Sequence, residues 1–242
     1  MSSNGPAITV VVPVRNEAGN VASLLAEIET ALAGRVFEVV YVNDGSTDGT
    51  GAEIGRLQAE RPWLRQLRHA QSCGQSAALR TGIAAARAPI VVTLDGDGQN
   101  DPAFLPTMID ALTQGAPRVG LIAGQRVGRK ATGFKRFQSR VANAVRGAVL
   151  RDGTRDTGCG LKAFPREVGL RLPYFDGLHR FLPALVRREG LEIGYVDVID
   201  RPRGSGTSNY GFFDRLWVGI LDLAGVWWLI RRRKRVPEVS EV

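Results

Sequence analysis

Three aspartates follow an apolar run in the stretch VVTLDGDGQNDP, which spans residues 91–102. Asp95 and Asp97 are two positions apart, so in an extended backbone both side chains project to the same side. Paired carboxylates suit Mg²⁺ or Mn²⁺, hard cations that keep water ligands and bridge to phosphates. Asp101 precedes Pro102 and a helical run, which predicts a helix N-cap. The spacing therefore predicts a metal site at Asp95 and Asp97 beside a structural Asp101.

Short β-rich runs alternate with helical patterns in the first half of the chain. The expected strands are 8–12, 37–42, 64–69 and 90–94, and the expected helices are 21–32, 50–60, 75–87 and 103–112. This alternation predicts an α/β fold with a mainly parallel sheet covered by helices. Ligands bind beyond the carboxyl ends of strands in such sheets. The polar loops RNEAGN, NDGSTDGT and DGDGQNDP fall at that edge.

Composition and charge narrow the class of protein. The 242 residues contain 32 Lys and Arg against 24 Asp and Glu, a net charge of +8 that favours anionic partners. With only two cysteines, no disulfide framework is expected, and a reducing compartment is favoured. The first apolar run is short and ends at Pro13, which predicts a strand and not a signal peptide. We expect a catalytic domain over residues 1–211 and a C-terminal appendage over residues 212–242.

The two commonest nucleotide-binding fingerprints, GxGxxG after a strand and GxxxxGK[ST], do not occur in the sequence. A sheet with acidic loops in place of glycine cradles must neutralise phosphate in another way. A divalent metal is the simplest solution, in agreement with the aspartate pair.

Five stretches in consistent order carry a resemblance to a known family: VVPVRNEAGN, VNDGSTDGT, GQSAALRTG, LDGDGQNDP and DTGCGLKAFPR. Together they resemble the family-2 glycosyltransferases, and within them the dolichyl-phosphate mannosyltransferase and polyprenyl-phosphate glycosyltransferase group. The resemblance covers about the first two hundred residues. It implies a GT-A type nucleotide-sugar-binding domain that uses a GDP- or UDP-linked donor.

The resemblance also implies roles for individual residues. A donor-nucleotide pocket would consist of Pro13, Arg15, Glu17 and Asp44, with Asp44 bonded to the base. The metal ligands would be Asp95, Asp97 and Gln99, and the catalytic group would be Asp97, Asp156 and Arg126. Contacts to the acceptor phosphate and the donor diphosphate would come from Arg126, Lys135, Ser139 and Arg140, and a mobile loop would contribute Arg201 and Ser208.

Three positions depart from the family pattern. Arg15 stands where tyrosine is common, Ser72 where asparagine is usual, and Asn209 where a loop lysine would fall. The last departure leaves the diphosphate without that lysine, and Arg201, Arg203 or Arg215 are candidates to replace it.

The implied reaction is inverting transfer of a sugar to a polyprenyl phosphate. A phosphate monoester is largely dianionic near neutral pH, with a second pKa near ~6, so its attack needs no strong base. Asp156 could then orient the acceptor or a cationic side chain. A hydroxyl acceptor, by contrast, would need a carboxylate base.

Other readings of the same residues remain open. A non-processive relative could glycosylate a saccharide or another hydroxyl acceptor, and a non-catalytic nucleotide-sugar-binding scaffold is a further alternative. The basic stretch over residues 126–140 could be a solvated helix face. Nucleic-acid binding is disfavoured because the basic residues lack interleaved aromatic platforms. His69 and His179 are expected to be structural, and Cys159 is not expected to act as a nucleophile.

The C-terminal segment Leu216–Ile230 is apolar except for Asp222, and Arg231–Arg235 follows it. An all-round apolar helix must be buried in protein or in lipid. Fifteen helical residues reach about 22 Å at ~1.5 Å each, less than the ~30 Å hydrocarbon core. The adjacent basic cluster and the tryptophans favour peripheral binding at the cytoplasmic face of the cell membrane. The alternative is a helix packed on the catalytic domain.

Overall fold

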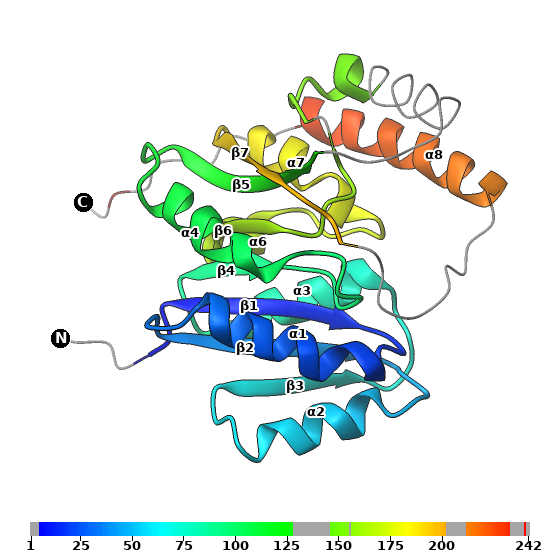
Figure 1. Cartoon of the computed structure of the whole chain (residues 1–242). Helices are drawn as coiled ribbons and strands as arrows, with labels where there is room; N and C mark the ends of the chain where they lie inside the picture. Colours follow the sequence, from blue (N-terminus) through cyan, green and yellow to red (C-terminus); the bar gives the residue numbers. More distant parts are fainter. Residues whose placement is uncertain (1–4, 128–145, 155, 202–211, 233–239, 241–242) are drawn as a thin grey trace.

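The computed structural model describes residues 5–127, 146–154, 156–201, 212–232 and 240, with no side-chain detail for 212–217. Seven strands form one sheet in the order β3-β2-β1-β4-β6-β5-β7 (Figure 1). Neighbouring strands pair in parallel except at β6, which runs antiparallel to both β4 and β5. The expected mainly parallel sheet is confirmed, with one reversed strand inside it.

The elements follow the expected alternation closely. The strands are β1 (Ile8–Val14), β2 (Phe37–Asp44), β3 (Leu64–His69), β4 (Ile90–Thr93), β5 (Val119–Arg126), β6 (Lys162–Pro165) and β7 (Glu192–Val198). The helices are α1 (Ala18–Ala31), α2 (Thr50–Gln58), α3 (Gln75–Ala85), α4 (Leu105–Thr113), α6 (Arg166–Arg171), α7 (Leu182–Arg188) and α8 (Phe212–Arg231). Two short 3₁₀ helices, η1 (Pro102–Phe104) and η2 (Leu178–Arg180), complete the order.

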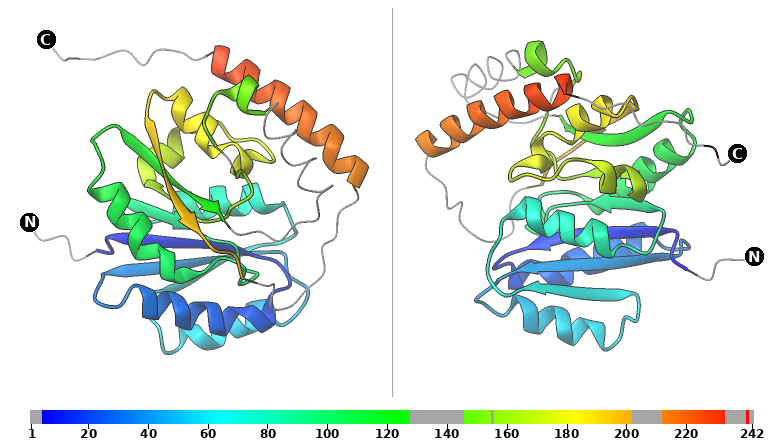
Figure 2. Two further views of the ribbon diagram at one scale, coloured as in Figure 1. Left: turned by 45° about the horizontal axis from the view of Figure 1, so that its top comes forward. Right: turned by 180° about the vertical axis from the view of Figure 1, so that it is seen from behind.

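Helices cover both faces of the sheet, which gives three layers (Figure 2). One apolar cluster joins α1, α2 and α4 to the sheet, and a second joins α3, α6, α7 and α8 to the opposite face. Strand β1 shows why both layers are needed: Val10 and Val12 belong to the first cluster, whereas Val11 belongs to the second. Alternate side chains point to opposite faces of a strand, so an all-apolar strand must be covered twice.

Helix α8 lies beside α7, beyond the β5 and β7 end of the sheet, in both views (Figures 1 and 2). Val226 is 1% exposed within the second apolar cluster, and the Arg188 side chain donates to the carbonyl of Leu229 at 2.9 Å. The opposite face carries exposed apolar side chains, among them Leu221, Trp227 and Trp228. Among the described residues, no helix combines the length and the apolar character needed to cross a membrane.

Candidate active site

The loops that follow β1 and β2 are tied to each other at the carboxyl edge of the sheet. Asn16 accepts a hydrogen bond from the backbone of Thr47 at 2.9 Å and donates its own backbone N–H to Ser46 at 3.0 Å. The backbone N–H of Glu17 donates to the hydroxyl of Thr50 at 2.9 Å. These reciprocal bonds fix the segment that contains Pro13, Arg15 and Glu17, where the exposed Arg15 remains accessible.

Asp44, the last residue of β2, collects four hydrogen-bond donors. One carboxylate oxygen accepts from His69 at 2.7 Å and from the backbone of Cys73 at 2.8 Å, and the other accepts from Ser72 at 2.8 Å and from the backbone of Gly74 at 2.9 Å. These donors fill the lone-pair sites of a carboxylate. Asp44 therefore fixes the loop after β3, and a nucleobase would reach it only by displacing one of these donors.

The same contacts determine the acidity of this carboxyl. Burial alone would raise the pKa of Asp44, but the hydrogen bonds from Cys73, His69, Ser72 and Gly74 outweigh it and hold the pKa below its ordinary value. The neighbouring backbone is equally crowded. Gly45 has φ +65°, and a Cβ there would lie 2.5 Å from the backbone nitrogen of Ser72, so this turn requires glycine.

His69 bridges two elements, because its second ring nitrogen lies 2.9 Å from the hydroxyl of Thr81. Asp44, His69 and Cys73 also place one ligand atom each within 4.8 Å of one another, as in a metal site. Among the described residues this is the one group of three such side chains, and it does not include Asp95 or Asp97. The hydrogen bonds already given satisfy Asp44 and His69 without an ion, as expected for a structural histidine.

Asp95 and Asp97 lie just beyond β4 and are electrostatically coupled. Burial and the charge of Asp97 raise the pKa of Asp95 to about 6. Asp97 is 9% exposed and accepts a hydrogen bond from the backbone of Gln99 at 3.1 Å. Gln75, at the start of α3, donates its side-chain amide to Asp95 at 2.7 Å. Two carboxylates that repel each other in a buried loop form a place where a cation is stabilising.

The loop that carries these aspartates is held from behind. Asn100 accepts from the backbone N–H of Asp95 at 2.9 Å and donates to Asp200 at 3.5 Å. Gly160 packs so closely that a Cβ there would lie 2.4 Å from the Asp95 carboxyl carbon and 2.5 Å from the Asn100 side-chain oxygen. The segment before β6 and the end of β7 therefore both fix Asp95 in place.

Arg126, the last residue of β5, lies between two carboxylates. Its guanidinium donates twice to Asp156, with the Nη2 bond at 2.7 Å, and Nη1 lies 3.1 Å from Asp200. Burial alone would raise the pKa of Asp156, but the bonds from Arg126 dominate and lower it. Bidentate pairing of this kind is strong and directional. Asp156 thus orients a cationic side chain, one of the two roles expected for it.

Arg201 contacts the loop that follows β4 and helix α1. Its guanidinium lies 2.6 Å from Asp101 and 2.5 Å from Glu27 of α1, and its backbone N–H donates to the carbonyl of Gln99 at 2.9 Å. Asp101 also accepts from the backbone of Ala103 at 2.9 Å and precedes Pro102 at the first position of η1. The predicted N-cap is confirmed, and an ion pair to Arg201 adds to it.

A cavity of about 240 Å³ opens beside Asp95. Segments from four parts of the chain line it: α3, the end of β4, the stretch before β6, and η2 with the start of α7. Its polar lining includes Gln75, Thr157, Lys162, His179 and Arg180. This cavity combines a carboxylate with two cationic side chains, so it is suited to a charged ligand.

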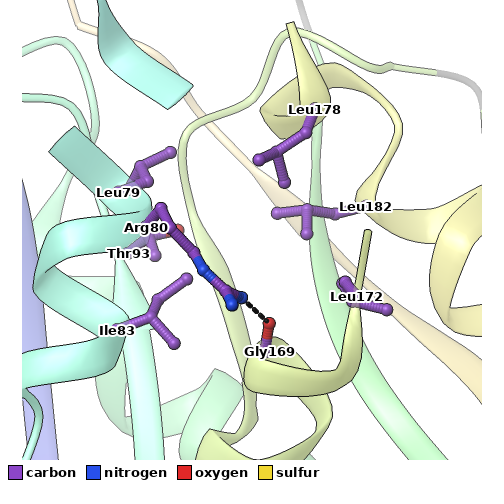
Figure 3. Close-up of a pocket in the computed structure, with 8 residues that line it drawn as sticks. All are labelled: Leu79, Arg80, Ile83, Thr93, Gly169, Leu172, Leu178 and Leu182. Atoms are coloured by element: carbon purple, nitrogen blue, oxygen red, sulfur yellow. Dashed lines mark hydrogen bonds between the residues drawn. The ribbon is translucent and has the colours of Figure 1, made fainter. Parts of the chain in front are cut away.

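Figure 3 shows a second hollow, of about 10 Å³, that shares Leu79, Thr93 and Leu182 with the larger cavity. Its lining is mainly apolar, and Arg80 crosses it to donate to the backbone carbonyl of Gly169 at 3.3 Å. A hollow of this size has room for no more than about one water molecule. The larger cavity beside Asp95 is therefore the candidate binding site for a polar ligand.

The predicted site residues other than Arg201, whose contacts are given above, divide into three groups. The structure brings Asp95, Asp97, Asp156 and Arg126 to one region and places Pro13, Arg15, Glu17 and Asp44 along the same sheet edge. Lys135, Ser139, Arg140 and Ser208 lie outside the described residues. Gln99 contributes backbone groups to the contacts given above, so its role as a metal ligand stays a prediction.

Sequence reasoning missed several residues that line the site or hold it in place: Gln75, Asn100, Lys162, Arg180 and Asp200. Gln75, Asn100 and Lys162 lie inside stretches that carry the family resemblance, whereas Arg180 and Asp200 lie outside them. For Asp200, the adjacent charged residue Arg201 was the available signal. Burial raises the pKa of Cys159 to about 11, which keeps its thiol protonated near neutral pH.

Comparison with known proteins identifies a matching family and similar proteins. Residues 9–169 match the family described as Glycosyl transferase family 2. The chain is 32% identical over 234 residues to a dodecaprenyl-phosphate galacturonate synthase from Rhizobium johnstonii, covering 94% of this chain and 68% of that protein. It is 32% identical over 208 residues to an undecaprenyl-phosphate 4-deoxy-4-formamido-L-arabinose transferase from Edwardsiella ictaluri, covering 84% and 63%. The chain thus spans about two thirds of the length of these relatives.

Solved structures agree on the fold. A glucosyl-3-phosphoglycerate synthase from Mycobacterium tuberculosis, in complex with Mn²⁺, UDP and its product, superimposes with a TM-score of 0.69 at 21% identity. The match covers 93% of this chain and 80% of that one. The expected GT-A type architecture is confirmed by this likeness.

Proposed function

The chain belongs to glycosyl transferase family 2, and we propose that it transfers a sugar from a nucleotide-sugar donor to a polyprenyl phosphate. The observation that carries the proposal is the coupled pair Asp95 and Asp97 beside a cavity with cationic side chains. Such a site accommodates a metal-bound diphosphate and a second anion together. The two relatives named above are transferases whose names specify polyprenyl phosphates, which supports the same acceptor class here.

The residues at the end of β4 fit Mg²⁺ or Mn²⁺. Asp95 and Asp97 supply hard carboxylate oxygens, and burial together with the charge of Asp97 raises the pKa of Asp95, a cost of the charged form that a cation would relieve. We propose these two side chains as ligands, with the Gln99 side chain as a third. A bound ion would offset the negative charge that develops on the departing diphosphate.

We place the donor nucleoside along the loops that follow β1 and β2. Pro13, Arg15 and Glu17 would line its pocket, as the family resemblance implies. Of the four donors to Asp44, the hydroxyl of Ser72 can rotate away most easily. An N–H group of the nucleobase would then take its place on that carboxylate. The donor is GDP- or UDP-linked, and the contacts of this loop would choose between the two bases.

The chemical step needs no proton transfer to the protein. An oxygen of the acceptor phosphate attacks the anomeric carbon while the bond from that carbon to the nucleoside diphosphate breaks, and the bonding electrons leave with the diphosphate. The products are a sugar–phosphate–lipid diester and a nucleoside diphosphate. In-line attack inverts the anomeric centre. The role of Asp156 is then to hold Arg126 in place, and Arg126 stabilises phosphate charge near the reacting atoms.

Helix α8 is proposed to bind the membrane surface. Its outward face presents Leu221, Trp227 and Trp228, and the guanidinium of Arg231 lies 3.9 Å from the ring centre of Trp227. Aromatic and basic side chains combined on one face suit the interface of an anionic bilayer. The basic Arg231–Arg235 stretch favours the cytoplasmic leaflet. The other face packs on α7, so both expectations for this segment combine in a peripheral helix.

The transfer proposal is tested by incubating the full chain with labelled nucleotide sugars, Mg²⁺ or Mn²⁺ and a polyprenyl phosphate. We expect one donor to give a lipid-extractable product, and chelation of the metal to abolish it. Exclusive transfer to a saccharide or another hydroxyl acceptor would refute the lipid-phosphate assignment.

Membrane binding is tested separately by replacing Trp227 and Trp228 with serine. The double variant should sediment less with vesicles that contain anionic lipid, at matched salt, while nucleotide-sugar binding is retained. Equal sedimentation of variant and wild type would contradict a role for this face of α8.

A further inference from the structure

We propose that Arg180 and His179 of η2, together with Lys162 of β6, form the subsite for the phosphate monoester of the acceptor. The inference rests on the proposed function and names where its second anion binds. The three side chains line the 240 Å³ cavity next to Asp95, on the side toward η2 and α7.

The first argument concerns which cationic side chains are available to an anion. Arg126 is 12% exposed and is paired with Asp156 and Asp200, so a dianionic phosphate that it contacts needs a further cation. Arg180 is exposed at the cavity, and no hydrogen bond or ion pair joins its guanidinium to another residue in the described part of the chain. A planar guanidinium with free donors is the side chain best suited to bind phosphate in a bidentate manner.

The second argument concerns the floor of the cavity. Lys162 is 5% exposed and donates to the backbone carbonyl of Cys159. Burial lowers the pKa of Lys162, and the negative charges of Asp95 and Asp156 oppose that effect and favour the charged amine. A dianionic phosphate in the cavity would add to the negative charge that Asp95 and Asp156 place around Lys162. A dianionic phosphate is then attracted inward from Arg180 at the surface toward Lys162 at the base.

His179 adds a neutral donor or acceptor between these cations. One ring nitrogen lies 2.8 Å from the hydroxyl of Ser76, which in turn accepts the backbone N–H of Gly177 at 3.0 Å. Burial lowers the pKa of His179 to about 3, so the ring is uncharged near neutral pH. With Ser76 holding one nitrogen, the other is left to meet a ligand in the cavity. The ring therefore positions the phosphate without adding charge.

The third argument is the direction from which a lipid phosphate would arrive. Gly177, which precedes η2, packs against Asp222 of α8, and a Cβ on Gly177 would lie 2.8 Å from a carboxylate oxygen of Asp222. The charge of Arg180 also acts on Asp222. The η2 segment therefore connects the helix proposed to contact the membrane with the cavity beside Asp95. A lipid headgroup that arrives at α8 would meet Arg180 before it reaches the loop that carries Asp95 and Asp97.

An acidic sugar on the donor would present the same chemistry as a phosphate, since both are oxyanions that pair with a guanidinium. The experiment therefore measures donor and acceptor separately, in the full chain. The variant is Arg180→Gln, which removes the charge at an exposed position and should fold normally. Arg180→Lys restores the charge, and Arg171→Gln is the matched control, because Arg171 is an exposed arginine of α6 paired only with Glu167 among the described residues.

Two measurements are made on each variant: the KM values for polyprenyl phosphate and nucleotide sugar, and the Kd for farnesyl phosphate, a short prenyl monophosphate, by calorimetry. We expect Arg180→Gln to raise the acceptor KM and the farnesyl phosphate Kd about tenfold or more, the loss of one charge-assisted contact. The donor KM should change by less than about twofold, Arg180→Lys should recover part of the loss, and Arg171→Gln should match wild type.

An unchanged Kd for farnesyl phosphate in Arg180→Gln would overturn the inference. So would a rise in the donor KM for an acidic sugar with no change for the acceptor, because the cavity would then hold the donor's carboxylate. If wild type transfers no sugar to any polyprenyl phosphate, the proposed function fails, and the farnesyl phosphate titration still decides whether Arg180 binds a phosphate monoester.

Discussion

Asp44 and Asp95 lie at the carboxyl edge of the same sheet, one at the end of β2 and the other just beyond β4, yet their surroundings differ in kind. Asp44 accepts hydrogen bonds from four donors of the protein, and its pKa is lowered. Asp95 is buried beside Asp97, and its pKa is raised to about 6 although Gln75 donates to it and the charges of Lys162 and Arg126 act on it. The hydrogen bonds of the protein outweigh burial at Asp44, whereas burial and the charge of Asp97 outweigh the favourable contacts at Asp95.

This difference indicates where the site depends on a ligand. A carboxylate satisfied by backbone N–H groups organises a loop and contributes to stability. A carboxylate held beside another one costs stability and is retained for what it can bind. The β2 side of the edge is therefore a preformed framework, and the β4 side becomes electrostatically complete only with a cation and anionic substrates.

The largest expected effect is at Asp97, in the loop that follows β4. Asp97→Asn should lower the rate of sugar transfer by about 100- to 1,000-fold, because stabilisation of the departing diphosphate is lost. Its free energy of unfolding should not fall, since one of two repelling charges is removed. Transfer rates and urea unfolding measure the two quantities. If Asp97→Asn kept wild-type activity in the presence of a chelator, the proposed metal site at Asp95 and Asp97 would be contradicted.

The complementary change on the other side should affect folding first. Asp44→Asn replaces an acceptor of four bonds with an amide that opposes some of its donors, and should lower the free energy of unfolding by about 2–3 kcal/mol. Asp110→Asn is the control, because Asp110 is 44% exposed in a surface pair with Arg35 and should cost no more than about 1 kcal/mol. Equal stabilities for the two variants would show that the four bonds of Asp44 contribute little.

The raised pKa of Asp95 predicts a pH dependence that Asp44 cannot produce near neutral pH. The folded carboxyl binds its proton near pH 6 and the unfolded one near pH ~3.9, so this group's contribution to stability is present at low pH and is lost as pH rises through 6. Metal-free protein should thus gain about 1.4 kcal/mol from this group between pH 7 and pH 5. Asp95→Asn should lack this gain in denaturant unfolding at both pH values. Identical pH profiles for the two proteins would contradict the assigned shift.

The smallest expected effect concerns Asp101. Variants of this residue test whether local structure and metal binding are independent within the loop that follows β4. Asp101→Ala loses the cap on Ala103 and the pair with Arg201, and should cost about 1 kcal/mol in thermal or urea unfolding. Asp101→Asn keeps a capping oxygen and should recover most of that loss. Both variants should retain Mn²⁺ affinity. A loss of metal binding in Asp101→Asn would place Asp101 among the ligands.

Much of this arrangement could be predicted from sequence because it depends on local patterns. Alternating apolar runs gave the first four strands and their helices, and the position of Asp101 before Pro102 gave the N-cap. The reversed strand β6 could not be predicted, because pairing direction is decided by contacts between distant segments. Arg180 was hidden for the same reason, since its proposed role depends on η2 packing beside the distant α3. The saturation of Asp44 depends on a loop 28 to 30 residues further along the chain.

One measurement tests the central proposal most directly: the rate of sugar transfer to a polyprenyl phosphate compared with transfer to the free polyprenol of the same length. Both acceptors are given to the full chain with Mn²⁺ and the productive nucleotide sugar, and the lipid phase is analysed by mass spectrometry. We expect a sugar–phosphate–lipid product from the phosphate and none from the alcohol. An equal yield from the free polyprenol would contradict the account, because the cations beside Asp95 would then have no phosphate to bind.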